Sequence, residues 1–127
     1  MRVAFFTEMG FQGKVSRTHS NMRTEFAWMV ALNADHYNLQ QTPTQEYDLG
    51  IVINSKNNPE HVDVARYKTK CSRVAIMQEG PFWYFQDYPL QNQVHYFNNL
   101  MGADIILAHN EVDVEYFRGL TGHPDVR

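Results

Sequence analysis

The stretch Ser72–Pro89, SRVAIMQEGPFWYFQDYP, decides the fold class that this sequence predicts. Within it, Val74–Met77 is an apolar run with no polar interruption, and the chain turns polar at Gln78 and Glu79 before the break at Gly80. A short apolar run between such boundaries is typical of a strand buried on both faces, as in a parallel sheet. Ligands of open α/β sheets bind beyond the carboxyl ends of the strands. We therefore expect Glu79 at the functional edge of the sheet.

Similar apolar runs recur along the chain and alternate with helical patterns. Further strands are predicted over Arg2–Thr7, Leu49–Ile53 and Ile105–Ala108, with a weaker one near His36–Leu39. One helix is predicted to begin after an N-cap at Thr18 or Ser20. Three more are predicted over Pro59–Lys70, Leu90–Met101 and Glu111–Leu120. Uninterrupted apolar strands that alternate with helices indicate a parallel sheet with right-handed crossovers. The sequence thus predicts an α/β fold, a Rossmann-like three-layer α/β/α sandwich with a mostly parallel sheet, as one domain over residues 1–127.

The predicted helices also carry recognisable stripes and caps. The stripe of the first helix consists of Met22, Phe26, Met29, Val30 and Asn33. The helix Leu90–Met101 carries Leu90, Val94, Phe97 and Met101 on one face, and Gly102 is its expected C-cap. In the helix Pro59–Lys70, Asn58 is the expected cap, because proline suits the first helical position.

Composition excludes several classes of protein. The net charge of −3 argues against nucleic-acid binding that depends on neutralising many phosphates. A local basic patch is still compatible with this net charge. The single cysteine, Cys71, excludes an intrachain disulfide and a cysteine zinc cage, and its place before a strand favours a buried, inert thiol. The six histidines show no metal-ligand spacing, so no metal site is predicted. The sequence lacks a GxSxG elbow, which excludes esterase chemistry of that type.

The apolar runs are short. None approaches the ~18 residues that a membrane-spanning helix needs. The N-terminal MRVAFFTEMG has too short an apolar stretch for a signal peptide and an early glutamate. We therefore expect a cytoplasmic protein with no membrane span.

Two carboxylates near the end of the central strand are the candidate catalytic residues. Glu79 is suited to act as a general base or to bind a sugar hydroxyl, because a carboxylate beside aromatic rings can have its pKa raised. Asp87 is a second carboxylate in the same loop, and two carboxylates at one site can divide acid and base roles. The structural alternative is that Glu79 caps a local turn.

Aromatic and polar residues around the same edge are candidates for binding a ligand. The cluster Phe82, Trp83, Tyr84 and Phe85 with Tyr88 can stack on a sugar or a base, and it is equally compatible with a hydrophobic lid or an interface patch. His109-Asn110 and Asn54-Ser55 also follow strands, so they are expected to line the same edge.

The loop after the first strand contains Gly10-x-x-Gly13-Lys14. Such a loop can bring backbone amides and a helix N-terminus towards a phosphate, and Lys14, Arg17, His19 and Arg23 add positive charge nearby. The motif is neither GxGxxG nor a Walker A loop, so a dinucleotide or P-loop site is not expected. Glycines that only turn a solvated loop are the equal alternative.

Four stretches of the chain are similar to a known family. The N-terminal domain of GT-B glycosyltransferases is resembled by the opening MRVAFFTEMGFQGKVSRTHSNMRTEFA, the strand Leu49–Ser55, the strand end RVAIMQEGP and the segment GADIILAHNEVDVEYFRGLTG. The likeness covers nearly the whole chain. Within that superfamily, the opening with Gly10, Gly13 and Arg23 is most similar to the DNA glycosyltransferases of tailed bacteriophages, which place sugars on hydroxymethylated cytosine.

The resemblance implies that residues 1–127 are the acceptor-side half of a glycosyltransferase, a hexosyl- or pentosyltransferase. It implies a nucleotide-sugar such as a UDP-sugar as co-substrate, no tightly bound cofactor, and an acceptor, with DNA as one candidate. Under the resemblance, the donor phosphates would lie near Gly10, Gly13 and Lys14, and the acceptor would be bound by Phe82, Trp83, Tyr84, His109 and Asn110. A donor-binding domain or partner chain would complete the enzyme, so this chain alone is expected to be incomplete; if phage-encoded, it would act in the host cytoplasm. Where the family has a histidine or aspartate after the fourth strand, this sequence has Glu79-Gly80.

Two alternatives from other classes stay open. One is a standalone Rossmann-like binding or interaction module without catalytic activity, in which the aromatic loop is a protein interface. The other is a small nucleotide-binding regulator of flavodoxin-like topology, which is less favoured because the acidic cluster at its strand ends is missing.

Overall fold

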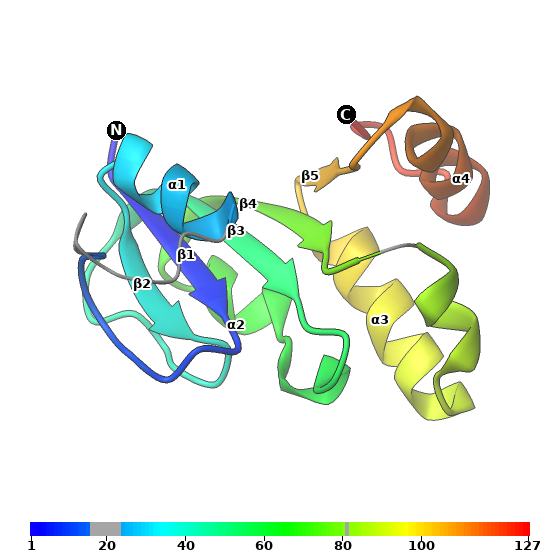
Figure 1. Cartoon of the computed structure of the whole chain (residues 1–127), viewed down its shortest axis with the longest axis horizontal. Coiled ribbons are helices and arrows are strands. Elements are labelled where there is room, and N and C mark those ends of the chain that lie inside the picture. The colour runs from blue at the N-terminus through cyan, green and yellow to red at the C-terminus, as the bar shows by residue number, and fades with distance from the viewer. Residues whose placement is uncertain (16–23, 81) are drawn as a thin grey trace.

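The structure is a computed structural model that describes residues 1–15, 24–80 and 82–127, with the backbone alone for 82–84 (Figure 1). The predicted caps Thr18 and Ser20, the stripe residue Met22, and Arg17, His19 and Arg23 lie outside the described residues. The same holds for the side chains of Phe82, Trp83 and Tyr84.

Five parallel strands form one sheet, which confirms the predicted Rossmann-like α/β fold. The strands are β1 (Val3–Thr7), β2 (Asp35–Asn38), β3 (Tyr47–Asn54), β4 (Cys71–Gln78) and β5 (Ile105–Leu107). Their order in the sheet is β2-β1-β3-β4-β5, the order found in flavodoxin-like sheets. The chain adds strands to one side of β1 and then to the other, so the switch point lies between β1 and β3. The weak strand expected near His36–Leu39 is present as β2.

Helices cover the two faces of the sheet unequally (Figure 1). Alternate residues of each strand face opposite sides, so Phe5 packs towards α1 (Thr24–Ala31) while Phe6 stacks on Tyr67 from the other side, with ring centroids 4.1 Å apart. That second side carries α2 (Val64–Lys68), α3 (Leu90–Gly102) and α4 (Glu111–Thr121), which build the larger core. Among the described elements, α1 is the one helix on the first face.

The segment predicted as one helix over Pro59–Lys70 is two shorter elements. A 3₁₀ turn, η1 (Pro59–His61), precedes α2 (Val64–Lys68), and Val62 between them is extended. The break has a local cause: the side chain of Asp63 accepts a hydrogen bond from the backbone N–H of Arg66 at 3.1 Å and caps a new helix. Pro59 does begin its turn, but Asn58 makes no side-chain cap hydrogen bond.

The apolar stripe of α3 faces away from the core. Leu90, Val94 and Met101 are 75%, 52% and 42% exposed, whereas the buried residues of the helix are Tyr96, Asn99 and Leu100. Asn99 is buried without penalty because its side chain accepts from the N–H of Val64 and donates to two carbonyls. Gly102 is the last helical residue, so the predicted glycine C-cap is wrong for α3; Gly122, with φ of 63°, provides one for α4.

Candidate functional site

A pocket of about 430 Å³ lies at the carboxyl edge of the sheet, on the face that α1 covers. Its described lining residues come from α1, from the ends of β3 and β4 and from the segment after β5: Thr24, Glu25, Trp28, Ile53, Met77, Gln78, Glu79, Gly80 and His109. The volume falls within the range of small-molecule sites, and the position is where open α/β sheets bind ligands. The structure therefore brings the predicted residues Glu79 and His109 together in one pocket.

Glu79 is held by the end of the neighbouring strand. Its backbone N–H donates to the carbonyl of Asn54 at 3.0 Å, and its Oε2 accepts from the N–H of Lys56 at 3.0 Å. The carboxylate thus caps the turn after β3, as the structural alternative expected, and it lines the pocket as well. The two roles are compatible, because a carboxylate has two oxygens and about four acceptor positions.

Further carboxylates gather beside Glu79. Glu8 follows β1 and accepts from the hydroxyl of Ser55 at 2.6 Å, and a small adjoining cavity is lined by Glu8, Glu25, Ser55 and Glu79 among others. Neither lysine nor arginine is among the described residues that line these two cavities. The described part of the lining is therefore acidic, and it favours neutral hydroxyl-bearing or cationic ligands over phosphates.

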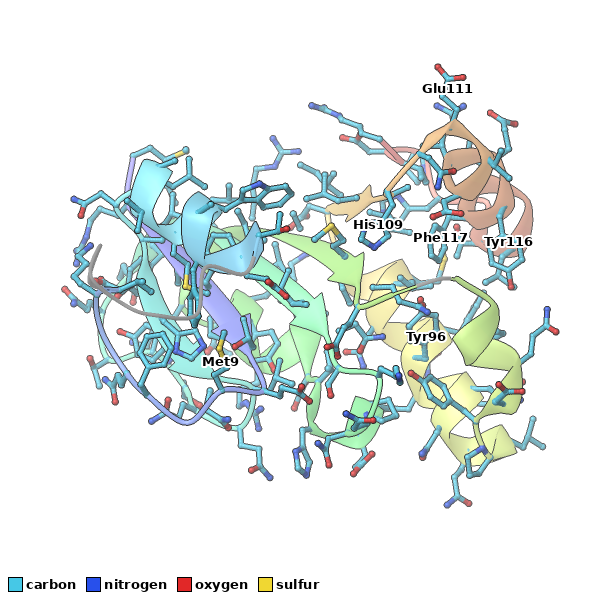
Figure 2. The ribbon with its side chains drawn as sticks, in the orientation of Figure 1. Met9, Tyr96, His109, Glu111, Tyr116 and Phe117 are labelled. Carbon is cyan, nitrogen blue, oxygen red and sulfur yellow. The ribbon has the colours of Figure 1, made fainter. Side chains whose placement is uncertain are left out.

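His109 has a defined orientation. Its Nε2 lies 2.8 Å from the carbonyl oxygen of Gln78, and since a carbonyl can only accept, Nε2 carries the proton. Nδ1 is then the acceptor of the neutral ring. Figure 2 shows the ring beside the carboxyl end of β4. The next residue, Asn110, is the N-cap of α4: its Oδ1 accepts from the N–H of Asp113 at 2.9 Å, so its amide oxygen has a structural partner.

Two lining residues from α1 were not predicted. Glu25 and Trp28 are three positions apart and so share one side of the helix, next to the buried Phe26 and Met29. Trp28 is 37% exposed, which leaves part of an indole available as a stacking surface. Their spacing was visible in the sequence, but the orientation of the helix over the sheet was not.

The glycine loop does not reach this pocket. After β1 the chain turns back along β2, where Gly13 exchanges two backbone hydrogen bonds with His36 at 2.9 and 2.8 Å. Gly13 has φ of 100°, a conformation that favours glycine. Lys14 then pairs with Asp35 at 3.0 Å, at the amino end of β2. The structure therefore separates Gly13 and Lys14 from Glu79, and Gly10 is not among the described residues of the pocket.

A buried histidine fixes the course of that loop. His36 Nδ1 donates to the carbonyl of Phe11 at 2.7 Å, and its Nε2 accepts from the hydroxyl of Thr7 at 2.8 Å. The ring also stacks on Phe11, with centroids 4.1 Å apart. Burial lowers the pKa of His36 to about 4, so the ring is neutral near pH 7. This network ties β1, β2 and the loop into one unit.

Asp87, Phe85 and Tyr88 are not among the described residues that line the pocket. Asp87 ends the 3₁₀ segment η2 (Phe82–Asp87), is exposed, and is not among the described lining residues. Phe85 and Tyr88 pack against Tyr96 of α3, at 5.0 and 6.3 Å between centroids, within the core on the other face. For these two rings the structure agrees with a lid packed on its own domain. Figure 2 shows Tyr96 and, from α4, Phe117 on this side.

Comparison with protein-family models, with curated proteins and with solved structures finds no match. Among the described residues, no group of three or more His, Cys, Asp or Glu side chains is arranged to hold a metal ion. In the same part of the chain, no helix is both long and apolar enough to cross a membrane.

Proposed function

We propose that this domain binds a hydroxyl-bearing acceptor in the carboxyl-edge pocket, as the acceptor-side half of a glycosyltransferase that uses a nucleotide-sugar donor. The observation that carries the proposal is the composition of the pocket, which joins the indole of Trp28, the imidazole of His109 and the carboxylates of Glu25 and Glu79. An aromatic face with carboxylates at its rim suits a sugar or a nucleoside, whose hydroxyls donate hydrogen bonds to the carboxylates.

The charge of the pocket supports the acceptor side rather than the donor side. A nucleotide-sugar carries a diphosphate, which needs cations or backbone amides, whereas the described lining residues provide carboxylates. The donor diphosphate would then be held by a second domain or a partner chain. If the acceptor is hydroxymethylated cytosine in DNA, the base would enter the pocket and the phosphate backbone would stay outside it.

Glu79 is the proposed general base. The acceptor hydroxyl would lose its proton to the carboxylate as its oxygen attacks the anomeric carbon, and the nucleoside diphosphate would leave with the electron pair of the broken bond. His109 lines the same pocket and is the second group able to hold that hydroxyl. Asp87 is not among the described lining residues, and we assign it no role.

Calorimetric titration tests this function. We expect a hydroxymethylcytosine nucleoside or simple glycosides to bind the 127-residue chain more tightly than UDP-sugars do. Glu79→Gln, which keeps the shape but removes the charge, should weaken acceptor binding by about tenfold, since a hydrogen bond to a charged group contributes about 1.5–3 kcal/mol. The matched control is Glu115→Gln on the exposed side of α4. Tight UDP-sugar binding without acceptor binding would contradict the proposal.

One observation favours the second candidate, an interaction module. The apolar face of α3 is exposed and lies on the other side of the sheet from the pocket. The two functions can coexist, because they use different faces.

A further inference from the structure

The outer face of α3 is an exposed apolar strip, here called the α3 stripe, that consists of Leu90, Val94, Phe97 and Met101. Three of these side chains are 75%, 52% and 42% exposed, and Phe97 is half-buried. None of the four belongs to either core cluster. A contiguous exposed strip of large apolar side chains marks an interaction site more often than a solvated surface.

The spacing of the stripe is that of a helix–helix seam. Its members follow one another at intervals of four, three and four residues, which is the d-a-d-a pattern of a heptad. The residues that hold α3 on its own sheet, Tyr96, Asn99 and Leu100, lie on the opposite side of the helix. α3 therefore presents one face to its own core and a second, heptad-spaced face outward.

The charge of α3 restricts the partner. Its 13 residues, LQNQVHYFNNLMG, include no Asp, Glu, Lys or Arg, and the stripe is flanked by neutral Gln91 and Asn98. Charged side chains are depleted at the centre of protein interfaces, whereas exposed helices usually carry several. A helix with no charge favours a partner surface that is also neutral, and another α3 is such a surface.

We propose that the α3 stripe pairs with the α3 stripe of a second copy of this chain, in a two-fold antiparallel arrangement. Antiparallel pairing would place Leu90 opposite Met101 of the second copy and Val94 opposite Phe97 of the second copy, so each layer joins side chains that complement each other in size. The two helix dipoles would run in opposite directions. A two-fold contact uses the same patch on both copies and closes on itself.

The size of the contact sets the expected strength. A helix of 13 residues is about 20 Å long, so the contact falls at the low end of specific interfaces, below about 1,200 Å² in total. The dimer should therefore be weak and concentration-dependent, with a dissociation constant in the micromolar range. Because α3 and the pocket lie on opposite faces of the sheet, the dimer would leave the pocket open.

Sedimentation velocity of the full 127-residue chain, from about 5 to about 500 μM, tests this proposal. We expect a monomer–dimer equilibrium. Val94→Glu should weaken it at least tenfold, because each copy would bring a charge into an apolar seam. The matched control is Val112→Glu on α4, a valine that is 71% exposed and lies outside the stripe, and this variant should dimerise as the parent does.

A charge-complementation experiment shows whether the stripe pairs with itself. Val94→Glu and Val94→Lys should each be monomeric, with unchanged helix content by circular dichroism, and an equimolar mixture should recover the dimer because the two charges then attract. A parent chain that is monomeric over the whole range would overturn the proposal. So would a dimer that Val94→Glu leaves intact, or one that Val112→Glu weakens equally.

Discussion

His36 is a residue whose protonation state the fold determines. It is completely buried, and both ring nitrogens have partners, Thr7 and the carbonyl of Phe11. Burial lowers its pKa from 6.5 to about 4. The unfolded chain therefore binds a proton between these two pH values and the folded chain does not, so stability falls as the pH is lowered through this window.

We predict that the free energy of unfolding decreases by about 2 kcal/mol between pH 7 and pH 5 through His36 alone. Urea unfolding at several pH values measures it. In His36→Gln the slope over this interval should be shallower, even if the variant is less stable throughout. His36→Asn serves as a second neutral variant, and an unchanged slope in both would contradict the assignment of this pH dependence to His36.

At the same scale, the sequence allowed only part of the site to be predicted. Glu79 and His109 could be placed at the pocket because each directly follows a buried parallel strand, and strand ends meet at one edge. Glu25 and Trp28 could not, since their position depends on how α1 rotates and docks over the sheet. Lys14 was expected near a phosphate, but the loop turns back along β2 through long-range pairing with His36, which no local spacing encodes.

Among the elements, the pair β3 and β4 forms the tightly packed centre of the sheet. Gly50 of β3 lies against Cys71 of β4: a Cβ at position 50 would lie 2.9 Å from Cys71 Sγ and 3.2 Å from Phe6 Cε2. Cys71 is buried, and burial raises the pKa of its thiol to about 11, so it is the inert core cysteine that was expected. The close approach explains why this position needs a residue without a side chain.

We predict that Gly50→Ala lowers the free energy of unfolding by about 1–3 kcal/mol, because the added methyl group overpacks the core. Cys71→Ala in the same chain should recover part of that loss, and a double-mutant cycle measures the coupling. The matched control is Gly119→Ala in α4, where a Cβ meets nothing within 4 Å; helix propensity should make this variant more stable by up to about 1 kcal/mol. Equal stability of Gly50→Ala and the parent would contradict the packing argument.

Helices were predicted less accurately than strands at this scale. Strands buried on both faces are continuous apolar runs, so the strands could be predicted from the sequence. The face that α3 buries could not be predicted, because the Asn99 side chain has hydrogen-bond partners in the interior, Val62 between η1 and α2 and Val64 of α2, while the apolar stripe stays outside. Likewise, Asp63 caps α2 and so begins a separate helix within the segment predicted as one. Helical periodicity alone does not reveal such an internal cap.

For the whole molecule, the fold positions a pocket at the carboxyl edge, whose described lining is acidic and partly aromatic, and a neutral helix with an apolar stripe on the opposite face. The α/β alternation was sufficient to predict the parallel sheet, since its crossovers and burial follow from general packing rules. The unequal covering of the two faces was not predictable in this way, because it depends on the strand order around the switch point.

The central claim is that the carboxyl-edge pocket binds the acceptor, and the most direct test is two-dimensional ¹H–¹⁵N NMR of the chain titrated with a hydroxymethylcytosine nucleoside. We predict saturable shifts of the Trp28 indole N–H and of the backbone amides of Glu79, Gly80 and His109, with the amides of Gly13 and Lys14 beside β2 unchanged. Shifts confined to Gly13 and Lys14, or no saturable shifts at the pocket with this nucleoside or with simple glycosides, would contradict the account.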